Sequence, residues 1–203
     1  LKDIVDAHGK VIQDLYNAGC RNIQLDDCTW GMMADRSGHL AYGTTAEGLK
    51  EIQKIHKDIN NQVIANAPKD LTINTHVCRG NFHSTYANSG AYDPVADILF
   101  GEENVNAYYL EFDDERSGGF APLAKVSGDK KVVLGLITTK SPKLENKEEV
   151  IARIKEAANY IPLDRLYLSP QCGFASCEIG NKLTEKEQWD KLRLVKEIAE
   201  EVW

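Results

Sequence analysis

His76 and Cys78 are two potential metal ligands that stand two residues apart in the chain. Side chains two residues apart in an extended segment point to the same face. The preceding segment, 71–75, is rich in β-branched residues and predicts a strand that ends at this pair. An imidazole and a thiol are ligands that zinc prefers. We therefore expect a zinc site at a strand end, completed from far downstream, where Glu111 and Cys172 also lie near the ends of predicted strands.

The segments that would position these ligands alternate between strand and helix patterns. Short apolar or β-branched runs predict the strands, and amphipathic spacing or capping residues predict the helices. Asn146 stands at one predicted helix start, and Thr184 with Glu187 forms a capping box at another. Segment 28–45 contains several glycines and predicts a long loop. Strands are predicted to end near residues 27, 76, 112, 137 and 170, and helices to cover 1–18, 46–59, 95–100, 120–126, 147–160 and a last segment from 184.

Five strands with long connections predict a parallel α/β sheet, and their largely apolar character indicates burial on both faces. An open doubly wound sheet and a TIM (β/α)8 barrel both fit this pattern. No glycine-rich phosphate loop follows a strand, which weighs against a nucleotide-binding doubly wound fold. Acidic, His and Cys residues instead follow the strands, where barrels keep their chemistry. Five strands cannot close such a barrel, so the chain is predicted to hold about its last five βα units.

Composition limits the partners that this chain can have. The 203 residues are 42% hydrophobic and 27% charged, which predicts a single domain over residues 1–203. The formal net charge of −7 argues against nucleic acid and anionic membranes, because both need clustered Lys and Arg. No apolar run reaches the roughly 18 residues that a membrane helix needs. Small-molecule substrates are the expected partners.

The cysteines indicate the compartment. There are five, an odd number spread along the chain, and no secretory signal precedes them. Disulfide-rich domains are usually smaller and have paired cysteines, so free thiols and a cytoplasmic location are expected. The chain also starts at Leu1 rather than at Met, which together with the strand count indicates a piece of a longer protein.

Four motifs, each at a predicted strand end, carry a family resemblance. In order along essentially the whole chain, they resemble the C-terminal catalytic barrel of cobalamin-independent methionine synthase, and most of all its short single-domain relatives. Each motif is weak alone, but four in order are fairly specific. The motifs are Ile23-Gln24-Leu25-Asp26-Asp27, Thr75-His76-Val77-Cys78, Tyr109-Leu110-Glu111-Phe112-Asp113 and Ser169-Pro170-Gln171-Cys172-Gly173-Phe174.

The resemblance implies a zinc-dependent methyltransferase. In such a site the sulfur of homocysteine binds the metal as a thiolate and then attacks a methyl group carried on nitrogen. Asp26 matches the carboxylate that receives the amino group of homocysteine. The long enzymes place a proton-donating histidine in a His-Ser-Pro turn, and here Lys140 takes its place before Ser141 and Pro142. The zinc ligands implied are His76, Cys78, Glu111 and Cys172.

Three functions fit these observations. The first transfers a methyl group from a methylated folate of the 5-methyltetrahydropteroylglutamate type to homocysteine, giving methionine. The second keeps the zinc but uses a methylcorrinoid donor or another thiol, as related barrels do. The third is a non-catalytic zinc-binding fragment. Because open sheet edges invite pairing with another chain, a homo-oligomer is also expected.

Several nearby residues have simpler interpretations. Cys20, Cys28 and Trp30 are expected to pack, although Trp30 could instead line a flat pocket for the methyl donor, and Cys177 lies outside the matched motifs. The remaining histidines and the acidic residues next to the motifs are expected to be solvated, with two alternatives: one of the acidic residues could orient His76, and His83 could approach the site. These histidines and acidic residues are His8, His39, His56, His83, Asp27, Asp113, Asp114 and Glu115.

Overall fold

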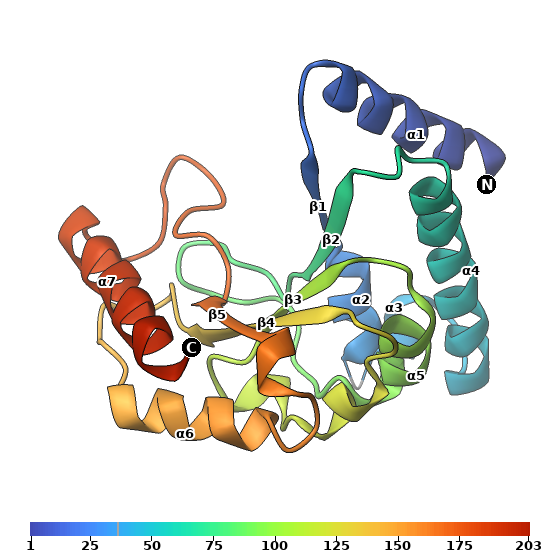
Figure 1. Ribbon diagram of the computed structural model, residues 1–203. Helices are drawn as coiled ribbons and strands as arrows, with labels where there is room; N and C mark the ends of the chain where they lie inside the picture. The colour runs from blue at the N-terminus through green and yellow to red at the C-terminus, as the bar shows by residue number, and fades with distance from the viewer. Residues whose placement is uncertain (36) are drawn as a thin grey trace.

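The computed structural model describes residues 1–35 and 37–203, which form a parallel five-stranded sheet with helices around it (Figure 1). The strands are β1 Asn22–Asp26, β2 Thr72–Val77, β3 Ala107–Glu111, β4 Lys131–Ile137 and β5 Leu166–Pro170. The α-helices are α1 Lys2–Asn17, α2 Cys28–Ala34, α3 Gly38–Ala41, α4 Ala46–Ala65, α5 Asp93–Glu102, α6 Lys147–Ala157 and α7 Glu185–Val202. Short 3₁₀ turns are η1 Glu115–Ser117, η2 Ala121–Lys125 and η3 Leu163–Arg165.

The order of the strands decides between the two folds that the sequence allows. Every neighbouring pair is parallel, and the order is β1-β2-β3-β4-β5, without the reversal that a doubly wound sheet requires. Successive helices contact one another around the outside, α1 with α4, α4 with α5, and α6 with α7. This arrangement is part of a (β/α)8 barrel, which confirms the predicted fold.

The side chains of the strands alternate between an outer and an inner face. Tyr108 and Leu110 of β3 lie in the main hydrophobic core together with residues of α5. On the other face, Asn74 of β2 donates a hydrogen bond to the side chain of Asn22 in β1, at 3.0 Å. The inner strands β2, β3 and β4 are buried along most of their length, as predicted, whereas β1 and β5 at the two edges are partly exposed.

The segment after β1 differs from the predicted loop, because it contains the helices α2 and α3. Trp30 and Met33 anchor α2, since both are fully buried. Gly31 allows the close approach: a Cβ atom there would lie 2.4 Å from the carbonyl oxygen of Cys78. These helices were missed because α2 and α3 are too short to show a helical period, and only tertiary packing stabilises them.

Other helix boundaries follow local capping chemistry. The Thr45 hydroxyl accepts a hydrogen bond from the Gly48 N–H at the start of α4, as predicted. Helix α4 continues past the predicted end at residue 59, because Asn60 and Val63 extend its buried face. Asn146 caps α6, and the predicted capping box of Thr184 opens α7. Among the described residues, none of the helices combines the length and the apolar character needed to cross a membrane.

Candidate metal centre

The structure brings four metal-binding side chains together at the carboxyl edge of the sheet. His76 and Glu111 lie at the ends of β2 and β3, Cys78 follows β2, and Cys172 follows β5. Parallel pairing places these ends at one level, with His76 opposite Tyr109. One donor atom from each of the four side chains lies within 4.8 Å of the other three. The predicted ligands therefore converge, although they are spread over almost a hundred residues.

His76 presents one ring nitrogen to this centre. Its Nδ1 atom lies 3.0 Å from the carbonyl oxygen of Tyr109, which makes Nδ1 the protonated nitrogen and leaves a lone pair on Nε2. The Nε2 atom is buried, has no hydrogen-bond partner among the described residues, and lies 3.9 Å from Oε1 of Glu111. Burial lowers the pKa of His76, but contacts with Cys78 and Glu111 raise it by more. A buried imidazole nitrogen that has no hydrogen-bond partner and lies beside a carboxylate is suited to bind a metal ion.

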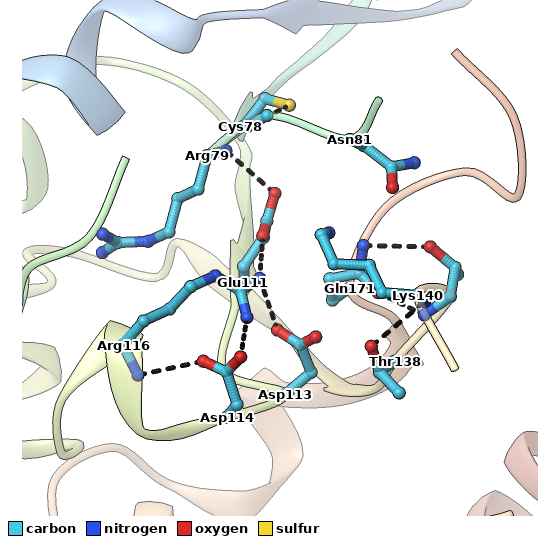
Figure 2. Close-up of polar contacts among 12 residues, drawn as sticks. Cys78, Arg79, Asn81, Glu111, Asp113, Asp114, Arg116, Thr138, Lys140 and Gln171 are labelled. Carbon is cyan, nitrogen blue, oxygen red and sulfur yellow. Dashed lines mark hydrogen bonds and ion pairs between the residues drawn. The ribbon is translucent and has the colours of Figure 1, made fainter. Parts of the chain in front are cut away.

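Glu111 is buried and held from two sides (Figure 2). Its Oε1 atom accepts a hydrogen bond from the backbone N–H of Arg79 at 2.9 Å, and its Oε2 atom accepts one from the Arg116 guanidinium at 2.6 Å. The pKa of Glu111 is raised, because the effect of burial exceeds the lowering by the Arg79 N–H and by the charges of Lys140 and Arg116. The carboxylate is thus fixed in place, with Oε1 directed toward His76.

The two thiols of the centre have pKa values that are shifted in opposite directions. A hydrogen bond from Cys172 lowers the pKa of Cys78 to about 3, and the Gly80 N–H, 3.4 Å from the sulfur, adds to the effect. The same contact with the Cys78 sulfur raises the pKa of Cys172. One imidazole, two thiols and one carboxylate are donors that zinc accepts in a four-ligand site, so this set fits the predicted ion.

Asp26 and Lys140 both lie near this centre. Asp26 lines a cavity of about 350 Å³ together with His76 and Cys172. Burial, and then the neighbouring Cys78 thiolate, raise the pKa of Asp26. The Lys140 Nζ atom is buried without a hydrogen-bond partner among the described residues, and Figure 2 shows this side chain next to Gln171. Asp26 thus shares a cavity with two of the predicted ligands, and Lys140 lies close enough to Glu111 for its charge to lower the pKa of that carboxyl group.

Arg116 is a residue of the centre that the sequence did not reveal. Its guanidinium pairs with Glu111, with Asp113 at 2.8 Å and with Asp114. The Asp113 side chain is buried because the chain turns back through η1 and brings Arg116 onto it. The sequence had predicted a solvated side chain at this position. The three-residue spacing between Asp113 and Arg116 is a weak signal without that turn.

A second buried network surrounds Asp27, which was also expected to be solvated. The Asp27 carboxylate lies 2.8 Å from Nε2 of His56 and accepts a hydrogen bond from Asn60 at 3.0 Å. Asn60 also donates to Glu103 at 2.6 Å, and burial raises the pKa of Glu103 to about 7. His56 packs edge-on against Trp30. The prediction that His56 is a surface residue is therefore wrong. Burial lowers the pKa of His56, but Asp27 raises it by more.

The remaining predicted side chains lie outside the centre. Among the described residues, Cys177 lies outside both groups of side chains that could hold a metal ion. The His83 Nδ1–H donates a hydrogen bond to the Gly180 carbonyl oxygen at 3.2 Å, so His83 joins two loops. Cys28 is exposed rather than packed in the core, and its sulfur lies near Cys78.

Sequentially ordered parallel strands with a His, Cys, Glu and Cys donor set at their carboxyl ends define a barrel protein with a centre that could hold a metal ion. Comparison with known proteins specifies the family. The model of the cobalamin-independent synthase catalytic domain matches residues 1–201, and the chain belongs to this family.

Individual relatives agree with this assignment. The uncharacterized protein YxjG of Bacillus subtilis is 49% identical over 99% of this chain and 53% of its own length. A methionine synthase of Pyrococcus horikoshii is 28% identical over 85% of this chain and 42% of its own. A solved vitamin-B12-independent methionine synthase-like protein of Listeria monocytogenes is 37% identical, with a TM-score of 0.75 over 98% of this chain and 54% of that one. The chain therefore spans about half the length of the relatives it matches.

Proposed function

We propose that this chain serves a zinc-dependent transfer of a methyl group to the thiol of homocysteine, which forms methionine. The carrying observation is that four suitable donor atoms converge within 4.8 Å in a member of the cobalamin-independent methionine synthase family. The proposed methyl donor is a methylated folate. The chain spans about half the length of these relatives, so the activity of the whole relatives is proposed for this chain and not inferred from the match alone.

His76, Cys78, Glu111 and Cys172 are the proposed ligands. When bound, zinc supplies the positive charge that keeps the acceptor sulfur as a thiolate near neutral pH. The Tyr109 carbonyl oxygen orients the His76 ring, and Arg116 fixes Glu111, so the protein holds its donor atoms in place before a substrate arrives.

Asp26 is proposed to bind the amino group of homocysteine. Its carboxylate lines the same cavity of about 350 Å³ as His76 and Cys172, so an amino acid held by Asp26 would have its thiol next to the ligand set. A carboxylate paired with an ammonium group is a charge-assisted contact, which gives both affinity and orientation.

Lys140 is proposed to supply the proton that the donor needs. As the new sulfur–carbon bond forms, the nitrogen–carbon bond of the donor breaks, and its nitrogen must take up a proton. The Lys140 Nζ atom is buried and has no hydrogen-bond partner among the described residues, so its N–H groups are available to the departing nitrogen.

Metal analysis of the purified protein tests the centre first. We expect about one tightly bound zinc per chain, because a four-ligand site is complete. The variants Cys78→Ser and Cys172→Ser should lose it. Cys177→Ser is the matched control, since Cys177 is outside the ligand group, and should retain it. Full zinc retention in both ligand variants would refute the assignment.

Methyl transfer is then measured with homocysteine and either a methylated folate or a methylcorrinoid. Turnover with the folate alone supports the proposed donor, and turnover with the corrinoid alone replaces it. Lys140→Met should abolish most turnover while the zinc content stays unchanged. A variant with wild-type turnover would exclude Lys140 as the proton source.

A further inference from the structure

A third thiol lies beside the ligand group, and the proposed reaction does not use it. Asp26, Cys28 and Cys78 form a separate cluster in which one donor atom from each residue lies within 4.8 Å of the other two. Cys78 belongs to both clusters, whereas Asp26 and Cys28 belong only to this one.

The fold itself holds Cys28 in this position. Cys28 is the first residue of α2, and only Asp27 separates this helix from the end of β1. The buried side chains of Trp30 and Met33 anchor this helix. Gly31 lets the helix backbone reach the Cys78 carbonyl oxygen, because any Cβ there would clash at 2.4 Å. The packing of α2 therefore places the backbone of Cys28 close to that of Cys78.

Acidic groups stand next to Cys28: the Asp26 carboxylate and the Cys78 sulfur lie within 4.8 Å of its sulfur, and Asp27 precedes it in the chain. Of the cations near the ligand group, Arg116 pairs with Glu111. Asp26 and Cys28 are both exposed, so an ion can reach them from solvent.

We propose that Asp26, Cys28 and Cys78 form a second metal position, which takes a thiophilic divalent cation such as Zn²⁺ or Cd²⁺. The Cys78 thiolate bridges this ion and the ion held by His76, Glu111 and Cys172. Charge favours such a pair of ions: two thiolates and a carboxylate outweigh one divalent cation, and Asp26 with a Cys28 thiolate adds the charge that a second cation neutralises. Binding releases the Cys28 proton to solvent.

Occupation of this position has a consequence that rests on the proposed function. Asp26 would then bind a metal ion instead of the amino group of the acceptor. An excess of zinc or cadmium should therefore raise the KM for homocysteine and leave kcat unchanged at saturating homocysteine.

Cadmium titration tests the second position without relying on activity. Bound Cd²⁺ is counted by equilibrium dialysis, and Cd–S bonds are followed by their ultraviolet charge-transfer absorption. The wild type and the Cys177→Ser control should bind two ions per chain, and Cys28→Ser and Asp26→Asn should bind one. Cys172→Ser should lose the ion at the four-ligand site, or bind it more weakly. It should keep the second ion, whose binding depends on Cys28. Circular dichroism verifies that each variant is folded.

The possible results separate the two proposals. A wild type that saturates with a single ion, or a second ion that persists in both folded variants Cys28→Ser and Asp26→Asn, overturns the second position and leaves the ligand group intact. An ion that is lost in Cys28→Ser but unaffected by Cys172→Ser supports the second position, even if the four-ligand site fails its own test.

Discussion

Replacement of Arg116 by methionine tests whether the ligand carboxylate is held by a buried cation. The guanidinium lies 2.6 Å from Glu111 and 2.8 Å from Asp113, and the side chains of these two acids are 0% and 1% exposed. Methionine keeps an apolar stem of similar length and removes the charge. Two buried carboxylates would then face each other without the cation that pairs with them.

The expected loss of stability follows from this burial. Breaking a buried ion pair by removing one partner costs about 3–5 kcal/mol, because an uncompensated charge stays in the interior. The third partner, Asp114, is 48% exposed, and an exposed pair contributes at most about 1 kcal/mol. Asp114→Asn is therefore the matched control, with a small expected effect. Since Arg116 lowers the pKa of Glu111, its removal should raise that pKa, and the penalty should shrink as the pH falls and Glu111 takes up a proton.

Urea unfolding of the metal-free and zinc-saturated proteins measures this effect. We expect the loss in Arg116→Met to be smaller with zinc, because a cation bound to Glu111 replaces part of the missing charge. A loss below about 1 kcal/mol in the metal-free protein would contradict the reasoning, since it would mean that the buried carboxylates do not need Arg116. An equal loss with and without zinc would show that Glu111 does not bind the ion.

Three further predictions concern other parts of the fold. Burial raises the pKa of Glu103 from 4.5 to about 7, so the folded state keeps a proton that the unfolded state releases in this interval. The wild type should therefore lose about 3 kcal/mol relative to Glu103→Gln as the pH rises through the interval, and parallel unfolding curves would disprove the shift. A Cβ atom at Gly135 would lie 2.7 Å from the Cα atom of Gln171, so Gly135→Ala should destabilise the protein by roughly 1–3 kcal/mol and weaken zinc binding in a chelator competition. Its control, Gly101→Ala, meets no atom within 4 Å and should be neutral or stabilising. Thr184→Ala removes the capping box of α7 and should cost about 1 kcal/mol in thermal unfolding, whereas no change would mean that the helix start is frayed.

The sequence by itself determined the strands, most helix starts and the identity of the converging donors. These features depend on local chemistry: the two-residue period of strands, capping side chains, and the rule that parallel strands end at one edge. His76 and Cys78 share a strand end, and such a pair can be recognised without knowing the fold. Glu111 and Cys172 also follow strands, and the family resemblance selected them from among other acids and thiols.

The sequence favoured the barrel over a doubly wound sheet, but only the tertiary structure gave the strand order and showed what surrounds the donors. Strand order depends on pairing between distant segments, for which the sequence contains no local signal. The short helix α2 was missed because packing of Trp30 and the close approach at Gly31 stabilise it, not its own period. Asp27 and Asp113 were expected to be solvated because acidic residues usually are, and they are buried here because His56 and Arg116 approach them in the folded chain.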